Sequence, residues 1–74
     1  MSILTSDDEK LKRLGSRLKI ARIKQNITQY KLALNCEMEK SSISKIEAGK
    51  INISYLTLLR FCKCLNIPFS DLGE

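Results

Sequence analysis

The sequence predicts an all-α fold, a compact domain of four to five helices. Apolar residues recur at steps of three and four in several separate segments, which is the spacing of one buried helix face. No segment alternates apolar and polar residues as a half-buried strand does. The chain has 74 residues, which is enough for one small domain. We place this domain at residues 6–74, behind a flexible N-terminal arm at residues 1–5 that shows no periodicity.

The first helix is expected from about Asp7 to Gln25. Ser6 followed by Glu9 fits a capping box, in which each side chain bonds the backbone N–H of the other residue. Arg22 falls on the buried stripe of this helix, and a charge on a buried face needs a partner. The apolar members of the stripe are Leu11, Leu14, Leu18 and Ala21.

Two short helices joined by a tight connection follow, at about residues 29–35 and 40–48. Thr28 suits the N-cap of the first, and Glu39 takes the same place, less favourably, before the second. Gly49 suits a helix stop in the left-handed region. The residues expected to face inward are Leu32, Ala33, Cys36, Ile43 and Ile46.

A fourth helix is expected from Tyr55 to about Leu65, with Ser54 as its N-cap. Pro68 can begin a last short turn at residues 69–72. The apolar face of this part of the chain is expected to comprise Tyr55, Leu58, Leu59, Cys62, Leu65, Phe69 and Leu72.

The charge distribution favours a polyanionic partner. The formal net charge is +5 and the pI is near 9.3. No acid occurs from Lys10 to Cys36, a stretch that holds eight basic residues. Nucleic acid is the first partner that such a field suggests, and an anionic membrane surface is the second. A solvated helix face rich in lysine is the simplest alternative.

The cysteines are predicted to be buried, reduced thiols of a cytoplasmic protein. There are three, Cys36, Cys62 and Cys64, and there is no histidine. Cys62 and Cys64 lie two positions apart in a helix, so they point to different faces and cannot close a metal site together. We therefore expect no metal and no cofactor.

Other classes of protein are disfavoured by features that the sequence lacks. The N-terminus has neither the basic start nor the apolar run of a signal peptide, and no apolar run is long enough to span a bilayer. There is no pair of carboxylates at catalytic spacing and no glycine-rich phosphate loop. We expect a protein that is not an enzyme, does not bind a membrane and has no room for a small-molecule sensing domain.

The outward face of the third helix carries the side chains that suit a reader of DNA bases. Hydroxyl groups donate to or accept from base edges, and lysine reaches guanine acceptors or phosphates. An ordinary surface helix with a polar face is the alternative. The residues predicted to contact bases are Lys40, Ser41, Ser44 and Lys45.

Residues that flank this helix are predicted to contact the DNA backbone. Gln29 begins the second helix, where a side-chain amide and free backbone N–H groups form a natural phosphate site. Tyr30 lies at the exposed start of the same helix. Lys50 and Asn52 follow the third helix and can reach the next phosphates.

Residues 14–72 resemble the Cro/C1-type helix-turn-helix family of phage repressors, restriction-modification controller proteins and antitoxins. The pieces T-Q-x-x-L-A, I-S-x-I-E-x-G-K and L-L-x-x-x-x-x-L occur in register. The residues that carry the resemblance are Leu14-Gly15, Leu18, Arg22, Thr28-Gln29, Leu32-Ala33, Ile43-Ser44, Ile46-Glu47, Gly49-Lys50, Asn52, Leu58-Leu59, Leu65 and Asp71-Leu72.

The resemblance implies a lambda-repressor-like arrangement of five helices, in which the second and third helices read DNA. It also implies a structural ion pair between Arg22 and Glu47, which would supply the partner that the buried arginine needs. Two positions depart from the family pattern. Glu37 stands where the turn between the reading helices usually has a glycine, so it must accept a positive φ or the turn must differ. Ile53 stands where a proline is common.

By the same resemblance, we expect a transcriptional regulator that binds double-stranded DNA, at a palindromic operator, as a homodimer. An antitoxin-like module that uses the same fold to bind another protein is the alternative. Ile20 and Ile23 on the first helix form a rival patch for the dimer contact. The residues predicted for the dimer interface are Ile51, Ile53, Leu56 and Phe61.

Overall fold

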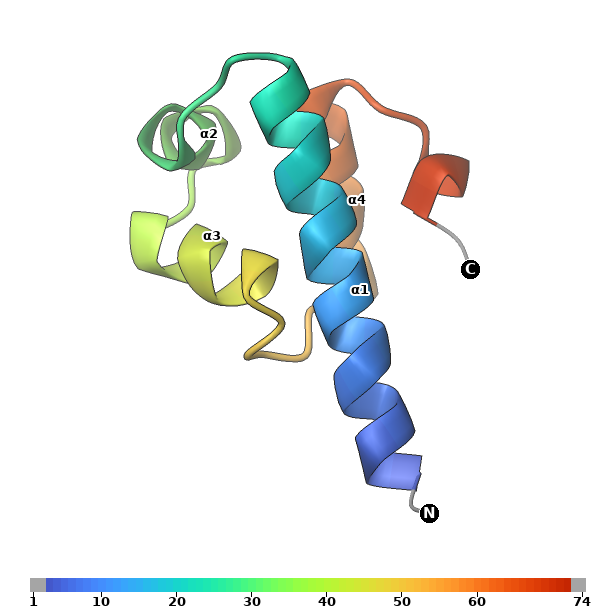
Figure 1. Cartoon of the computed structure of the whole chain (residues 1–74). Helices are drawn as coiled ribbons and strands as arrows, with labels where there is room; N and C mark the ends of the chain where they lie inside the picture. Colours follow the sequence, from blue (N-terminus) through green and yellow to red (C-terminus); the bar gives the residue numbers. More distant parts are fainter. Residues whose placement is uncertain (1–2, 73–74) are drawn as a thin grey trace.

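The all-α prediction is confirmed. A computed structural model describes residues 3–72, with side chains from Asp8 onward. The described chain comprises α1 (Ile3–Lys24), α2 (Gln29–Cys36), α3 (Lys40–Glu47), α4 (Tyr55–Leu65) and the 3-10 turn η1 (Phe69–Leu72) (Figure 1).

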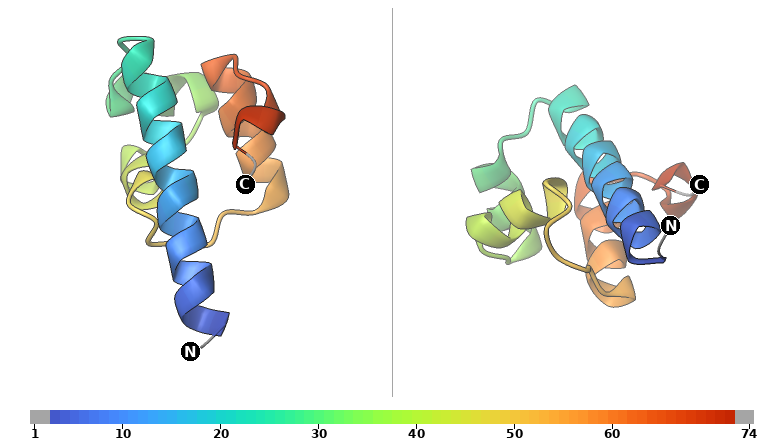
Figure 2. Two further views of the ribbon diagram at one scale, coloured as in Figure 1. Left: turned by 45° about the vertical axis from the view of Figure 1, so that its right-hand side comes forward. Right: turned by 60° about the horizontal axis from the view of Figure 1, so that its bottom comes forward.

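Helix α1 begins earlier than predicted. It starts at Ile3, so Ser6 lies inside the helix and cannot be its N-cap. No glycine or proline interrupts the first turns, and extending a helix costs much less than starting one, so the helical backbone continues past the expected boundary. Of the arm predicted at residues 1–5, Ile3–Thr5 are therefore helical, while Met1 and Ser2 lie outside the described residues. Figures 1 and 2 show this end of α1 projecting beyond the other helices.

Helix α1 is the central support of the domain. It packs against α3, α4 and η1, and α2 packs against both α3 and α4 (Figure 2). The pair α2–α3 thus lies on one side of α1, and η1 lies on another. The predicted apolar stripe of α1 is confirmed at Leu18, which is fully buried. Leu14 and Ala21 of the same stripe are partly buried against the core. The buried apolar residues are Leu18, Leu32, Ala33, Cys36, Ile43, Ile46, Phe61, Cys62, Leu65 and Leu72.

The buried face of α4 is rotated from the predicted one. Phe61 is fully buried, although it was assigned to the surface, and Tyr55 is 64% exposed, although it was assigned to the core. The observed stripe runs through Leu58, Phe61, Cys62 and Leu65, which is also a spacing of three and four residues. Phe69 is exposed as well, and its ring meets the ring of Tyr55 edge to face at 5.8 Å.

Local signals set the helix boundaries. Thr28 Oγ1 accepts from the backbone N–H of Lys31, and Ser54 Oγ accepts from that of Thr57, so both predicted N-caps are confirmed. Glu39 takes the N-cap position of α3 without a side-chain hydrogen bond. Among the described residues, those with a left-handed backbone are Asn26, Glu37, Gly49 and Asn66, and each follows a helix.

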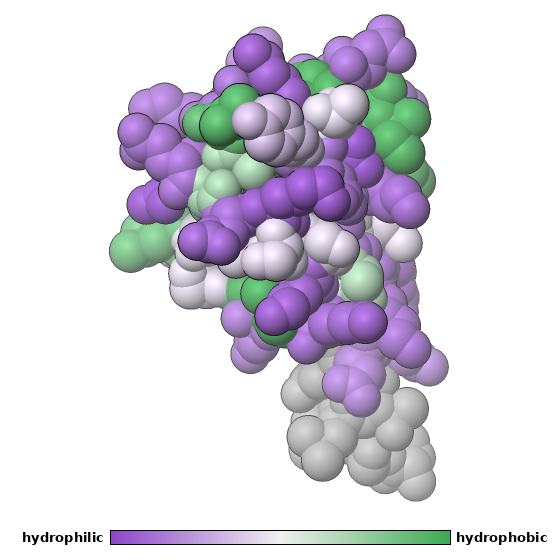
Figure 3. All heavy atoms as spheres, turned by 90° about the vertical axis from the view of Figure 1, so that its left-hand side faces the viewer, coloured by the Kyte–Doolittle hydropathy of each residue, from purple (hydrophilic) through white to green (hydrophobic). Residues whose placement is uncertain are grey.

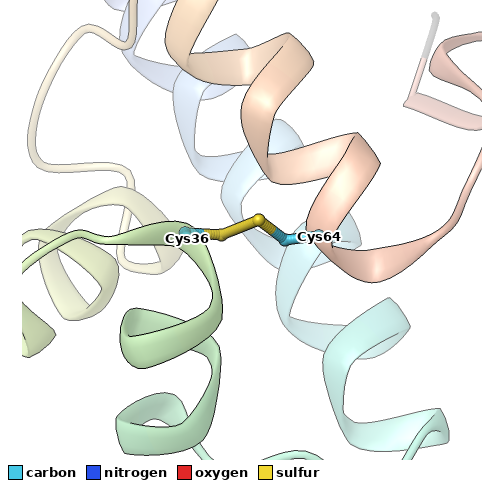
Figure 4. Close-up of a disulfide and its surroundings, with 2 residues drawn as sticks. All are labelled: Cys36 and Cys64. Carbon is cyan, nitrogen blue, oxygen red and sulfur yellow. A yellow bond between two sulfur atoms is a disulfide. The ribbon is translucent and has the colours of Figure 1, made fainter.

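Two of the three cysteines are joined, which corrects the prediction of three reduced thiols. Cys36 ends α2 and Cys64 lies in the last turn of α4, and their sulfur atoms form a disulfide (Figure 4). The two Cα atoms are 5.9 Å apart, within the usual range for such bonds. Cys62 is unpaired and buried, as predicted. Burial raises the pKa of the Cys62 thiol, and the charge of Asp71 adds to the rise.

Candidate nucleic-acid interface

Helix α3 has two sharply different faces. Ile43 is fully buried, and Ile46 and Glu47 are nearly so, which fixes this face against the core. The opposite face is open to solvent and carries the four residues predicted to contact bases. Figure 3 views the side formed by α2 and α3, where hydrophilic residues cover most of the surface. The exposed residues of α3 include Lys40, Ser41, Ser44 and Lys45.

The C-terminal end of α3 is bonded to α1 by the ion pair that the family resemblance implied. Arg22 Nε lies 2.7 Å from Glu47 Oε2, and Arg22 Nη2 donates to Glu47 Oε1 at 3.0 Å. Arg22 Nη1 donates to the carbonyl oxygen of Ile27 at 2.7 Å, so the guanidinium is bonded on each side. Both side chains are buried. The arginine found on the apolar stripe is therefore a structural residue that holds the third helix at a set position.

Gln29 belongs to the same network. Its Nε2 donates to Glu47 Oε1 at 3.0 Å, so Glu47 joins the first helix, the start of α2 and the end of α3. An amide nitrogen carries two hydrogens, and one remains for an acceptor outside the protein. Gln29 is half-buried, whereas Tyr30 beside it is 63% exposed. The start of α2 thus presents one restrained donor and one free aromatic ring.

The segment after α3 lies against α1. Lys50 and Asn52 are exposed, and Asn52 shares a shallow hollow with Lys10 and Leu11 of α1. Gly49 packs so closely on α1 that an added Cβ would lie 2.7 Å from the Cα atom of Lys12.

Lys10 and Lys12 of α1 therefore lie beside the segment that follows the C-terminal end of α3, and the sequence alone does not predict this proximity. The acid-free run that begins at Lys10 was the available signal. This run shows that the residues are basic, but it does not show that they lie beside the C-terminal end of α3.

Two acids flank the start of α3. Glu37 and Glu39 are both exposed, one in the turn and one at the N-cap of α3. Glu37 has φ 56° and ψ 46°, so it accepts the left-handed conformation that glycine usually takes there. Both acids therefore place negative charge at the N-terminal end of α3.

The residues predicted for a dimer contact fall into two groups. Leu56 is 75% exposed and Ile51 is 38% exposed, so both can meet a partner. Ile53 is partly buried against the core. Phe61 is fully buried within the monomer and is removed from the predicted interface, because it fills the stripe between Leu58 and Leu65.

Within residues 3–72, no group of three or more potential ligands is placed to hold a metal ion. No described helix combines the length and the apolar character that crossing a membrane requires.

Comparison with known proteins identifies the family. A helix-turn-helix family model matches residues 18–72. The chain is 34% identical over 59 residues to the control protein C.BamHI of Bacillus amyloliquefaciens, a match that covers 78% of this chain and 73% of that protein.

Solved structures share the fold. The restriction-modification controller protein C.AhdI of Aeromonas hydrophila superposes with a TM-score of 0.82 at 27% identity, over 85% of this chain and 96% of that one. The clp gene regulator ClgR of C. glutamicum gives a TM-score of 0.83 at 24% identity, over 85% and 81% of the two chains. The chain therefore belongs to the Cro/C1-type helix-turn-helix family of DNA-binding transcriptional regulators, which are not enzymes.

Proposed function

We propose that α3 enters the major groove of an operator and that its outward face reads the base edges. The observation that carries this proposal is the division of α3 between a buried, ion-paired face and an exposed polar face. A reading helix must be held rigidly while its side chains remain free to meet bases. The residues that we assign to base contacts are Lys40, Ser41, Ser44 and Lys45.

The flanking residues then grip the DNA backbone. The remaining amide hydrogen of Gln29 donates to a phosphate, and its bond to Glu47 sets the direction of that donor. Tyr30 lies along the sugar-phosphate chain beside it. Lys50 and Asn52 contact phosphates beyond the C-terminal end of α3, and Lys12 adds positive charge there.

The protein acts as a homodimer on a palindromic operator. One domain of this size buries too little DNA surface for high specificity, whereas two copies reading inverted half-sites double the contacts. We assign the contact between copies to the exposed apolar residues before and at the start of α4, Ile51 and Leu56. The rings of Tyr55 and Phe69 extend this surface. Ile53 is partly buried against the core.

The biological role that we propose is control of a restriction-modification system, by binding its operator in the cytoplasm. The similarity to C.BamHI and C.AhdI supports this assignment, since both are controller proteins.

Selection of bound sites from a random pool of duplex DNA tests the proposal. We expect a palindrome with half-sites about one helical turn apart. Binding to the selected site should weaken steeply as salt rises, because phosphate contacts release counterions.

Lys45→Ala should alter the preferred bases. Lys24→Ala is the matched control. It removes the same charge from the part of α1 that faces η1, so it should leave the selected sequence unchanged. No enrichment of any sequence would refute the proposal and would favour a protein-binding role for the fold. Equal effects of the two substitutions on affinity, with no change in sequence, would refute the assignment of Lys45.

A further inference from the structure

We propose that Cys36 and Cys64 form a thiol–disulfide site that an anionic low-molecular-weight disulfide, such as oxidised glutathione, closes to stabilise the DNA-reading helices. The site lies away from the proposed DNA contacts. It is a means of regulating that function rather than a part of it, and it rests on the cytoplasmic role proposed above.

The disulfide spans the part of the chain that reads DNA. Cys36 is the last residue of α2 and Cys64 lies in the last turn of α4, 28 residues later in the sequence. The chain between them includes the turn at Glu37 and all of α3. Closing the bond therefore restrains the reading helix within a ring of covalent bonds, and opening it leaves packing alone to hold the end of α2 (Figure 4).

The disulfide restrains a turn at Glu37 whose backbone conformation is unfavourable. Glu37 follows Cys36 directly and has φ 56°, a left-handed conformation that costs free energy for a residue with a side chain. A bond at the preceding residue keeps α2 in the position from which this turn leads into α3. Without the bond, the turn can relax at the expense of the angle between the two helices.

The site is open to a small reagent of negative charge. Cys36 is almost fully buried, whereas Cys64 is partly exposed. Both border a hollow of about 390 Å³ whose other walls include the cations Arg60 and Lys63 and the acid Glu37. Two cations against one carboxylate favour the approach of a disulfide that carries carboxylates.

The chemistry balances as two thiol–disulfide exchanges. The Cys64 thiolate attacks one sulfur of the small disulfide, forms a mixed disulfide and releases one small thiolate. The Cys36 thiol then loses its proton to water and attacks the Cys64 sulfur, which releases the second small thiolate. The protein loses two electrons and two protons, and the reagent becomes two thiols. Cys62 does not compete, because it is buried in the core.

In the cytoplasm, where we propose that the protein acts, a disulfide that can open and close can regulate it. Cytoplasmic thiols keep most cysteines reduced, and a disulfide that forms there is usually transient or redox-sensing. The bonded pair has its Cα atoms 5.9 Å apart, within the usual range, so the fold described here accommodates the closed bond.

The test begins without DNA, so that it is independent of the proposed operator contacts. The full chain is equilibrated with reduced and oxidised glutathione at ratios from strongly reducing to strongly oxidising. Free thiols are then alkylated and located by peptide mass. We expect Cys36 and Cys64 to pair with one midpoint inside this range, with Cys62 remaining free. The melting temperature of the oxidised form should exceed that of the reduced form by at least about 8 °C.

The same samples are then titrated with the selected DNA. We expect the reduced form to bind about threefold more weakly or worse, because ordering the reading helices then costs free energy on binding. The double variant Cys36→Ser/Cys64→Ser should show neither difference. Cys62→Ala should retain both, since each comparison is made between redox states of one variant.

Three free thiols in oxidised glutathione, a pair that includes Cys62, or a bond that stays closed in excess reduced glutathione would each overturn the proposal. Equal melting temperatures of the two forms would do so as well. A chain that pairs and stabilises as expected but binds no DNA would instead count against the proposed operator contacts. DNA affinity that is identical in the two forms would overturn the regulatory step.

Discussion

Gly15 lies against the backbone of Glu47. A Cβ atom added at this glycine would be 2.5 Å from the carbonyl oxygen of Glu47 and equally close to that of Ile46. No real Cβ atom approaches an oxygen so closely, and both oxygens belong to the backbone, so the two helices would have to move apart. Gly15 thus allows α1 to cross the end of α3 at the distance at which Arg22 can reach Glu47.

Gly15→Ala should lower the free energy of unfolding by about 2 kcal/mol, the usual cost of overpacking a close contact. Ser16→Ala is the matched control, because Ser16 is the next residue of α1 and is exposed. Urea unfolding monitored by circular dichroism measures both. A Gly15→Ala variant as stable as the control would contradict the close approach.

Glu47→Ala should lower the free energy of unfolding by about 3 kcal/mol, because it leaves the buried guanidinium of Arg22 without its carboxylate. Glu9→Ala, an exposed change of the same kind on α1, should have little effect. Thermal and urea unfolding provide the measurement, and unchanged stability would refute the structural role of the pair.

The double variant Arg22→Met/Glu47→Leu separates stability from reading. Removing both charges should restore most of the lost stability, since no unpaired charge remains. DNA affinity should nevertheless remain below that of the unsubstituted protein, because the side-chain amide of Gln29 then has no acceptor to set its direction. Full recovery of DNA binding in this variant would show that the bond to Gln29 is not needed.

Glu37→Gly should stabilise the protein by about 0.5–1 kcal/mol. Glycine removes the left-handed strain at φ 56°, and this gain exceeds the added entropy of the unfolded chain. Glu37→Gln keeps the strain while removing the charge, so it should leave stability nearly unchanged. Asn66→Gly provides a second comparison. Its gain should be smaller, because asparagine tolerates the left-handed region. Equal effects of Glu37→Gly and Glu37→Gln in urea unfolding would assign the change to charge.

Stability should fall at alkaline pH partly through Cys62. Burial raises the pKa of this thiol, and Asp71 adds to the rise. Above about pH 8.5 the thiol loses its proton in the unfolded chain but keeps it in the fold. The unfolded state then binds fewer protons, so stability declines as pH rises, whereas below that pH this group adds no slope.

The measurement is urea unfolding from pH 7 to pH 10, in a background in which Cys36 and Cys64 are alanine so that no disulfide exchange occurs. Cys62→Ala in this background should show a shallower decline above pH 8.5 than its parent, because lysine and tyrosine groups contribute equally to both. Parallel profiles would contradict the burial of the thiol.

Local signals explain how much of the fold the sequence predicts. Thr28 and Ser54 cap helices through bonds to residues three positions away, so their roles can be found without knowing the tertiary structure. Helix α4 was predicted with the observed bounds for the same reason. Arg22 stood out because a charge on an apolar stripe violates the local pattern, and the family resemblance supplied its partner.

The errors arise where distant residues decide the outcome. Phe61 and Tyr55 both fit a helical stripe, and packing against the rest of the core chose between two rotations of α4. The bond between Cys36 and Cys64 joins two helices across 28 residues, and no spacing rule predicts such a pair. Within the candidate site, the exposure of Lys40 and Lys45 agrees with the predicted outward face, whereas the proximity of Lys12 to Gly49 depends on how α1 crosses α3.

The two faces of α3 give this domain a form of modularity. Its buried face is shared with the core and tolerates little change, whereas the residues of the outward face are exposed to solvent. Under the proposed function, the outward side chains can therefore be exchanged for those of another regulator without redesigning the rest of the protein. New operators would then be acquired by a few substitutions in one short helix, with the melting temperature unchanged.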